Sequence, residues 1–371
     1  MERWRSAVEE MVVNRHFWND KRVLITGHTG FKGSWLCLWL QSLGVNVSGY
    51  SLPPPTNPSH FDISRVGDEM QSHIGDVRNL ESLKQIVSRT RPEIVFHLAA
   101  QPLVRYSYTN PVETYATNVL GTVHLFEAVR AVSGVHAVIV VTSDKCYDNR
   151  EWVWGYREDD PIGGYDPYSS SKGCAELVTA AYRSAFFGTP KDDERGVAVA
   201  SVRAGNVIGG GDWAEDRLIP DVIRAFTSHR PVEIRNPNAI RPWQHVLEPL
   251  SGYLRLAERL CESGSAWAEA WNFGPGEDDT KTVEWVVRRA TEIWGGDASW
   301  RADPGSHPHE ARSLRLDTSK ARSRMKWKPR WNLDHALQAT FEWYLAHERD
   351  DDMHAYTISQ IQKYEQTQLP N

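Results

Sequence analysis

Residues 21–40 read KRVLITGHTGFKGSWLCLWL, and this stretch decides the fold. Its first six residues form a short apolar run that predicts a buried strand. Glycines follow at positions 27, 30 and 33, and apolar residues then recur at helical spacing. A Gly-rich turn between a strand and a helix offers backbone N–H donors and a helix N-terminus to a phosphate. The alternative is an ordinary strand–helix turn, but the context favours dinucleotide binding. The residues expected to bind are Gly27, Thr29, Gly30, Phe31, Lys32 and Gly33.

Strand and helix patterns alternate beyond this stretch, as far as about residue 204. Such alternation is typical of a parallel sheet covered by helices on both faces. We therefore expect an α/β fold with a Rossmann-like, doubly wound parallel sheet. The predicted strands are Val45–Tyr50, Ile94–Leu98, Ala137–Thr142 and Val197–Arg203, and the predicted helices are Leu80–Thr90, Asn118–Val129 and Tyr168–Phe187.

The composition and the length of the predicted elements change after residue 204, where loops rich in Gly, Pro and Trp separate shorter elements. A chain of 371 residues suits about two domains. We expect an N-terminal appendage at 1–19, in which Met11 is an alternative start. A dinucleotide-binding domain is expected at 20–204 and a smaller, mixed substrate domain at 205–371. Part of the latter, about 240–275, is expected to return to the first domain.

Charge and composition exclude several classes of protein. The net charge of −6 gives no basic footprint for nucleic acid. No apolar run approaches the roughly 18 residues that cross a bilayer, so we expect no membrane partner. The four cysteines lie far apart without a C-x-x-C pair, which argues against a zinc site and a disulfide framework. Since the N-terminus also has no apolar signal-peptide core, the cytoplasm is the expected compartment.

The second predicted strand ends Gly49-Tyr50-Ser51-Leu52, without the acid that commonly binds the adenosine ribose. It also carries no arginine for a 2′-phosphate, so the choice between NAD and NADP stays open on this evidence. Asp76 and Val77, after the next strand-like stretch, are candidates for contact with the adenine. Asp76 is equally well explained as a solvated turn residue.

Tyr168 and Lys172 stand four residues apart and so share one face of a predicted helix. An ammonium beside a phenol favours the phenolate, which lowers the pKa of the tyrosine and makes it a base for an alcohol proton. Lys172 is also placed to hydrogen-bond a nicotinamide ribose. The pattern alone is weak. However, it follows the Gly-rich turn by about 140 residues, and Ser143 ends a strand that lies between them.

Together these features resemble the extended short-chain dehydrogenase/reductase family, over nearly the whole chain from about residue 20. The segments 97–101 (HLAAQ) and 118–122 (NVLGT) fit the same pattern. The resemblance implies NAD as cofactor, running along Leu98, Ala99 and Ala100, with Gln101 near the substrate. It also implies a homodimer, or a dimer of dimers, formed through the helices at 113–130 and 168–187.

The residues after Ser143 are Asp144 and Lys145. In that family an acid/base pair at these two positions resembles the nucleotide-sugar 4,6-dehydratases, and Asp-Lys resembles those that act on CDP-glucose. The segments 27–40, 205–221 and 241–246 strengthen this resemblance. It implies that Tyr168 takes the 4-OH proton, Lys172 tunes it and Ser143 bonds the same oxygen. It further implies that Asp144 is the acid at O6 and Lys145 the base at C5. The alternative is a solvated ion pair at a strand end.

The diphosphate and nucleotide need donors of their own. Glycines expose N–H groups, and a guanidinium binds two phosphate oxygens at once. The substrate-binding candidates are Gln101, Asn206, Gly210, Leu218, Arg241 and Arg312.

Three other functions compete with this interpretation: a 4-epimerase, a dehydratase for another nucleotide sugar and a non-catalytic dinucleotide sensor. No metal is expected.

Overall fold

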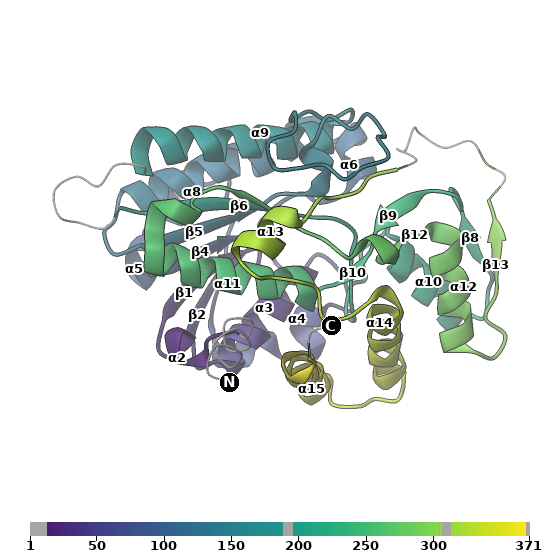
Figure 1. Cartoon of the computed structure of the whole chain (residues 1–371). Coiled ribbons are helices and arrows are strands. Elements are labelled where there is room, and N and C mark those ends of the chain that lie inside the picture. Colours follow the sequence, from purple (N-terminus) through teal and green to yellow (C-terminus); the bar gives the residue numbers. More distant parts are fainter. Residues whose placement is uncertain (1–12, 188–195, 304, 306–312, 369–371) are drawn as a thin grey trace, which may run out of the picture.

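The structure is a computed structural model that describes residues 13–187, 196–303, 305 and 313–368. A seven-stranded sheet forms the centre of its larger part (Figure 1). The strand order is β11-β6-β5-β4-β1-β2-β3 and every neighbouring pair is parallel, which confirms the doubly wound α/β fold. The strands are β1 (Arg22–Thr26), β2 (Asn46–Ser51), β3 (Gln71–Ile74), β4 (Ile94–His97), β5 (Ala137–Val141), β6 (Ala198–Ala204) and β11 (Ala270–Phe273).

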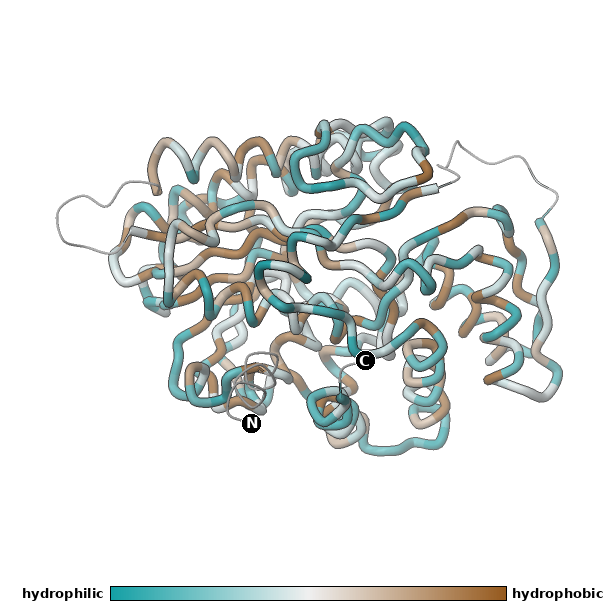
Figure 2. Tube along the Cα trace, in the orientation of Figure 1, coloured by the Kyte–Doolittle hydropathy of each residue, from teal (hydrophilic) through white to brown (hydrophobic). Residues whose placement is uncertain are grey.

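Helices cover both faces of this sheet, because consecutive strand residues point to opposite sides. In β1, Leu24 packs with the helices on one face, whereas Val23 and Ile25 pack with those on the other. The central strands are accordingly the most continuously apolar part of the trace in Figure 2. The first face carries α5 (Leu80–Thr90), α8 (Gly121–Arg130) and α9 (Pro167–Tyr182), and the second carries α3 (Phe31–Ser42) and α11 (Leu247–Ser263).

The described part of the N-terminal segment packs against this sheet. Short helix α2 (Arg15–Trp18) places the Trp18 ring, which is fully buried, over Phe96 of β4 with ring centroids 6.3 Å apart. The Trp18 Nε1 donates to Glu258 on α11 at 2.7 Å. Val13 and Trp18 thus contribute to the core, although this short segment has no hydrophobic period that would indicate it.

The chain crosses between the two parts of the molecule several times. After β6 it builds part of the smaller lobe, and it then returns through α11 and β11, which lies beside β6 at the edge of the large sheet. Three two-stranded sheets brace the smaller lobe: β7 with β10, β8 with β13 and β9 with β12. The remaining elements there are β7 (Val207–Ile208), α10 (Leu218–Thr227), β8 (Val232–Ile234), β9 (Ile240–Pro242), β10 (Gln244–His245), β12 (Thr280–Thr282), α12 (Val283–Trp294), β13 (Trp300–Ala302) and α14 (Leu333–Glu348). Helix α13 (Ser319–Arg324) packs against β11, and α15 (Met353–Gln366) packs against α3 and α14.

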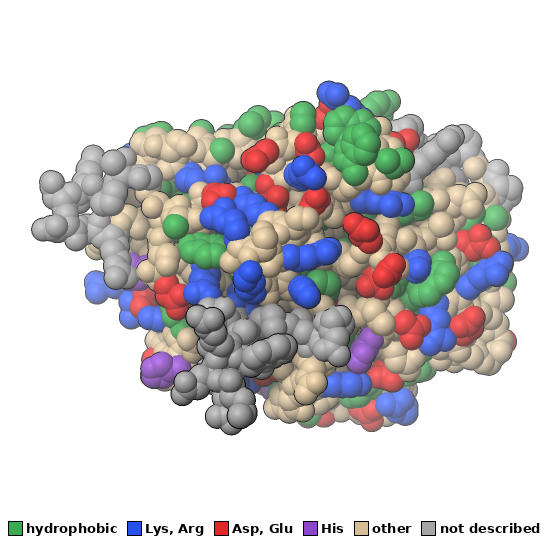
Figure 3. All heavy atoms as spheres, viewed as in Figure 1, with side chains coloured by type: hydrophobic (Ala, Val, Ile, Leu, Met, Phe, Trp, Pro, Cys, Tyr) green, Lys and Arg blue, Asp and Glu red, His purple; other side chains and the backbone are tan. Residues whose placement is uncertain are grey.

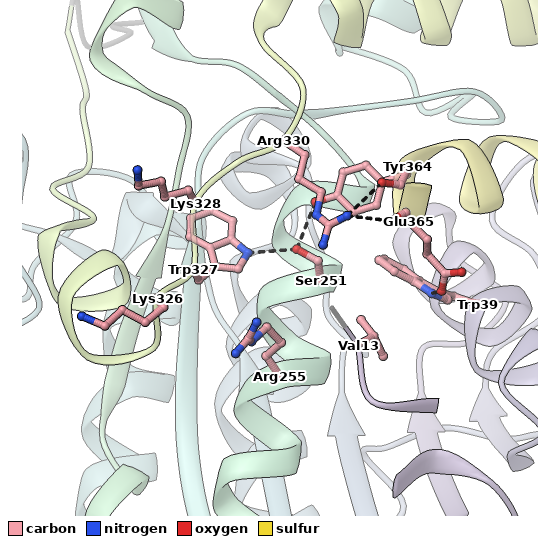
Figure 4. Close-up of a pocket in the computed structure, with 10 residues that line it drawn as sticks. All are labelled: Val13, Trp39, Ser251, Arg255, Lys326, Trp327, Lys328, Arg330, Tyr364 and Glu365. Atoms are coloured by element: carbon pink, nitrogen blue, oxygen red, sulfur yellow. Dashed lines mark hydrogen bonds between the residues drawn. The ribbon is translucent and has the colours of Figure 1, made fainter. Parts of the chain in front are cut away.

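Hydrogen bonds around a small pocket join the C-terminal helix α15 to α11 (Figure 4). Arg330 donates to the carbonyls of Tyr364 and Glu365, at the C-terminal end of α15. Trp327 Nε1 donates to Ser251 Oγ at 2.9 Å, and the Tyr364 hydroxyl donates to the same oxygen. The bonds from Arg330 satisfy carbonyls that the end of α15 leaves without partners of its own.

Cationic and acidic side chains are interspersed over the face shown in Figure 3. Within the described ranges, no helix combines the length and apolar character that a bilayer crossing requires.

Candidate active site

Four of the predicted site segments follow parallel strands that end at the same edge of the sheet. The Gly-rich turn follows β1, Leu98–Gln101 follow β4, Ser143–Lys145 follow β5 and Asn206 follows β6. The chain leaves β1 in one direction toward β2 and later returns to its other side as β4. Such a reversal of strand order opens a crevice at the carboxyl ends of the strands, where ligands of α/β proteins bind.

The turn after β1 is pressed tightly against its neighbours. Gly27 has a φ of +79°, and a Cβ there would lie 2.6 Å from the backbone nitrogen of Ala99. A Cβ on Gly33 would lie 2.2 Å from the carbonyl oxygen of Gly27. Both glycines are therefore required by the protein's own packing, the first for its left-handed backbone and the second for the close approach of α3.

Gly30 is different, and it supplies the test for a dinucleotide. Its φ is −78°, and the nearest atom to a Cβ there would be Gly27 O at 3.4 Å. Packing within the described protein thus does not demand glycine at this N-cap of α3. A pyrophosphate lying against the helix N-terminus would demand it, since a side chain would hold the phosphates away from the N–H groups. The residues present fit a dinucleotide.

Lys32 lies at the start of α3 and faces the same centre. The pKa of Lys32 is lowered to about 7, chiefly by burial and also by the nearby cations Lys172 and Arg217. Asp144 and Asp212 act in the opposite direction. A lysine assigned to the cofactor from the sequence is therefore electrostatically coupled to the proposed catalytic residues. Its role as a cofactor residue stays a prediction.

Small hydroxyl residues lie at the end of β2, where the sequence analysis looked for a residue that binds the adenosine ribose. Thr29 Oγ1 lies 2.9 Å from Ser51 Oγ and donates to the carbonyl of Leu52, which fixes the end of β2 against the turn. The Asp76 carboxylate accepts from Arg78, both from its backbone N–H and from its side chain. Arg78 thereby holds the pKa of Asp76 below its ordinary value, although burial opposes this. Val77 has its side chain buried beneath Gly121, so its backbone is the part left to face a ligand.

At the end of β5, Ser143 and Asp144 form one unit. Ser143 Oγ donates to Asp144 Oδ1 at 3.0 Å and accepts from the backbone nitrogen of Lys145. Asp144 is only 3% exposed, and its Oδ2 has no hydrogen-bond partner among the described residues. Burial raises the pKa of Asp144, against the opposing effects of Lys145, Ser143 and Arg241. A carboxyl in this setting is not half of a solvated ion pair.

Tyr168 and Lys172 lie on the buried face of α9, as their spacing predicts. The Tyr168 hydroxyl has a side-chain hydrogen bond with Ser143. However, burial raises the pKa of Tyr168 to about 12, so the expectation of a lowered pKa is wrong for the protein without ligands. The Lys172 ammonium donates instead to the carbonyl of Val141, at 3.3 Å. Burial also lowers the pKa of Lys172 to about 8, while Glu176 opposes that change.

The substrate-binding candidates fall into different settings. Arg241 on β9 lies near enough to Asp144 to lower its pKa, so it faces the catalytic centre. Gln101 uses its side chain within its own loop, accepting from Leu103 and donating to Thr114. Gly210 is packed against Trp343, whose Cγ would lie 2.0 Å from a Cβ at that position. Asn206 lies between β6 and β7 and Leu218 begins α10, whereas Arg312 is outside the described residues.

Two functional candidates escaped the sequence analysis. Arg217, the residue before α10, is held by Asp212 at 2.9 Å and lowers the pKa of Tyr168. Glu176 lies two helical turns beyond Tyr168 and is buried beneath Lys172. The i, i+4, i+8 spacing on α9 was a signal for Glu176, but no spacing rule could place Arg217. Within the described ranges, no group of three or more His, Cys, Asp and Glu side chains could hold a metal ion.

A parallel sheet with its Gly-rich turn and its Ser–Tyr–Lys group at one edge defines an extended short-chain dehydrogenase/reductase. Comparison with known proteins narrows this class. Residues 24–340 match the family described as GDP-mannose 4,6 dehydratase, and the chain belongs to that family. It is 57% identical over 353 residues to a CDP-glucose 4,6-dehydratase of Salmonella typhimurium, covering 95% of this chain and 98% of that protein.

More distant relatives share the fold. The chain is 25% identical to a UDP-glucose 4-epimerase of Rhizobium leguminosarum, covering 87% of this chain and 97% of the relative. Among solved structures it is similar to MoeE5 in complex with UDP-glucose and NAD, at a TM-score of 0.71 and 28% identity over 88% of this chain and 99% of that one. A dTDP-glucose 4,6-dehydratase from Bacillus anthracis in complex with NAD has a TM-score of 0.72 at 22% identity, covering 89% and 98% of the two chains.

Proposed function

We propose that this chain is an NAD-dependent CDP-glucose 4,6-dehydratase, a hydro-lyase that converts CDP-glucose into CDP-4-dehydro-6-deoxyglucose and water. The observation that carries this proposal is the 57% identity to such an enzyme over 95% of the chain. The buried Asp144 at the end of β5, followed by Lys145, supplies the acid and base that the elimination needs. A 4-epimerase needs neither.

The reaction removes the hydrogens of O4 and C4, then the C5 proton and the C6 hydroxyl, and finally returns the C4 hydrogen to C6 while C5 takes up a proton. NAD, when bound, accepts the C4 hydrogen with its electron pair and gives it back at C6, so it is not consumed. Gly27, Gly30 and the N-terminus of α3 would hold its pyrophosphate. Lys172 would bond its nicotinamide ribose once the ammonium leaves the carbonyl of Val141.

Each proton then has an acceptor or donor on this chain. Tyr168 accepts the 4-OH proton, and Ser143, already bonded to its hydroxyl, holds the same substrate oxygen. Because the pKa of Tyr168 is about 12 without ligands, the cations Arg217 and Lys172 must favour the phenolate during this step. The ketone formed at C4 acidifies C5, where Lys145 accepts the proton.

Asp144 donates a proton to O6, which leaves as water. Its burial favours the neutral, proton-bearing carboxyl. The unpartnered Oδ2 is the atom free to carry that proton, since Oδ1 accepts from Ser143. After the departure of water, the carboxylate left behind is stabilised by Ser143 and by the nearby charge of Arg241.

Incubation of the purified chain with CDP-glucose and NAD tests the function. We expect a sugar nucleotide lighter by one water, detected by mass spectrometry, with a 4-keto group that absorbs in alkali. UDP-, GDP- and dTDP-glucose run in parallel examine the choice of nucleotide. A product of unchanged mass with inverted C4 would identify an epimerase instead, and cofactor binding without any turnover would identify a sensor.

We further propose a homodimer formed through α7 (Pro111–Tyr115), α8 and α9, in the cytoplasm. Apolar side chains along these elements are exposed in the single chain, and burial in a helical interface would remove them from water. Light scattering after gel filtration tests the dimer. The four cysteines are free thiols, which is typical of a reducing compartment. The exposed residues are Val112, Tyr115, Leu120, Leu177 and Phe186.

A further inference from the structure

Glu176 is a buried carboxylate for which the reaction described above has no use. It is 5% exposed and lies on α9 in line with Tyr168 and Lys172, at spacings of eight and four residues. Burying an ionised carboxylate costs several kcal/mol unless it is paired and hydrogen-bonded. An ionised carboxylate this deeply buried therefore needs partners that stabilise it.

Three donors from two neighbouring strands satisfy the Glu176 carboxylate. Thr142 Oγ1 donates to Oε1 at 2.5 Å, and Ser201 Oγ donates to Oε2 at 2.7 Å. Arg203 Nη2 donates to Oε2 at 2.8 Å in an ion pair whose members are both about 5% exposed. Despite burial, these bonds hold the pKa of Glu176 below its ordinary value, so it is ionised at neutral pH.

One of these donors belongs to the catalytic strand end. Thr142 directly precedes Ser143 and Asp144, and its hydroxyl reaches across to α9. The Lys172 ammonium binds the carbonyl of Val141, one residue earlier on the same strand. In the protein without ligands, Glu176 and Lys172 thus fasten consecutive residues at the end of β5 to consecutive turns of α9. The bond between Thr142 and Glu176 is the one that remains when Lys172 turns to the nicotinamide ribose, so the separation between Ser143 and Tyr168 depends on it.

Arg203 is in turn anchored, so Glu176 cannot move to meet Lys172 directly. Its Nη1 donates to the Tyr147 hydroxyl at 2.7 Å and to the carbonyl of Glu158 at 2.9 Å. The Tyr147 hydroxyl donates to Asn272 on β11. The carboxylate is therefore a fixed negative charge one helical turn beneath the Lys172 ammonium.

We propose that Glu176 is a positioning residue of the dehydratase: it sets the end of β5 against α9 and keeps Lys172 cationic. This inference rests on the proposed function. Two variants of the same ion pair separate the charge of Glu176 from the packing around it. Glu176→Gln removes the charge beneath Lys172, whereas Arg203→Lys keeps both charges of the pair and removes the forked hydrogen bonds of the guanidinium.

The readout is the pH dependence of kcat with CDP-glucose, alongside a thermal melt to confirm folding. For Glu176→Gln, we expect kcat to fall about tenfold at neutral pH, while KM stays within about twofold of the wild-type value. We also expect the alkaline limb of the kcat profile to move to lower pH by about one unit. The direction follows because Lys172 loses its neighbouring negative charge and gives up its proton sooner. For Arg203→Lys, which keeps the charge of Glu176 paired, the limb does not move to lower pH. Equal shifts in both variants, or no shift in Glu176→Gln, would overturn the proposal.

Thr142→Val supplies a second, independent test that holds even if Glu176→Gln fails to fold. It keeps every charge and removes one hydrogen bond, so we expect a lower kcat with an unmoved limb. Full kcat in Thr142→Val contradicts the fastening of β5. If the wild-type chain does not act on CDP-glucose, the proposed function fails by itself. The charge effect is then decided by the pH dependence of the NAD dissociation constant in the same variants.

Discussion

Ser143 Oγ donates to Asp144 Oδ1 at 3.0 Å and leaves Asp144 Oδ2 buried without a partner among the described residues. A buried polar atom normally has a partner, because an unsatisfied one costs about 1–3 kcal/mol. Among the buried atoms without a partner in the described part of the chain, this one belongs to the carboxyl that follows Ser143, the serine proposed to bind the reacting oxygen. We interpret it as an atom kept available for the oxygen at C6.

Replacing Asp144 tests that interpretation. Asp144→Asn keeps the shape and the bond to Ser143 but removes the acid, so kcat for dehydration should fall by about 100-fold or more. Oxidation at C4 should persist, because Tyr168 and Ser143 are untouched. Rapid mixing, with the absorbance of reduced NAD followed in time, should show reduced cofactor accumulating in the variant. A kcat within threefold of wild type would exclude Asp144 as the acid.

Lys145 is predicted to remove the C5 proton. Lys145→Met, which keeps the length of the side chain, should lower kcat by about 100-fold or more. Turnover in deuterated water gives the more specific result, because the proton lost from C5 is replaced by solvent. We expect Lys145→Met to incorporate deuterium at C5 at least about 100-fold more slowly than the wild type, in step with its slowed product formation, as judged by NMR. Normal incorporation would assign the base to another group.

Cofactor affinity should depend on pH. Lys32 and Lys172 have pKa values of about 7 and about 8, so both lose their positive charge as the pH rises from about 6 to 9. The pyrophosphate binds the cationic forms better, so the dissociation constant of NAD should increase over this range, by roughly tenfold per charge lost. Fluorescence quenching at constant ionic strength measures it. Lys32→Met should abolish the lower step, and an NAD affinity that is flat across this range would contradict the assignment.

Gly210 is predicted to matter through packing. A Cβ there would lie 2.0 Å from Trp343 Cγ, so Gly210→Ala must displace α14 or the loop itself. We expect a loss of about 1–3 kcal/mol in the free energy of unfolding, measured by urea titration. Gly276→Ala is the matched control, because its Cβ would meet nothing nearer than an Asp279 oxygen at 3.8 Å. Unchanged stability with a raised KM would restore Gly210 to a purely substrate-binding role.

The sequence was most informative where local signals agree. The helix predicted at Leu80–Thr90 has those bounds in the structure, because Asn79 caps it with its side chain and Leu83 and Val87 fix its buried face. The sequence also predicted that Tyr168 and Lys172 share one face of a helix, since their spacing within that helix decides it. It did not predict the burial of Trp18, the position of Arg217 or the bond between Thr142 and Glu176. Each of these depends on a contact between segments that are distant in the sequence.

The prediction of a lowered pKa for Tyr168 failed for a related reason. Spacing places an ammonium beside a phenol, but it gives neither the depth of the pair nor the competing acceptor at Val141. Burial is the largest cause of the raised pKa of Tyr168 in the protein without ligands. The phenolate therefore has to be generated by the bound molecules together with Arg217 and Lys172, which the pattern of residues alone does not reveal.

The repeated passage of the chain between its two lobes has a consequence for engineering. β11 belongs to the large sheet and α11 packs on it, while elements before and after them build the smaller lobe. Neither lobe is therefore one continuous stretch of sequence. A new sugar preference cannot be transplanted by one splice at residue 205. An exchange of lobes needs several junctions at once, and single-residue changes around the crevice are the more economical route to altered specificity.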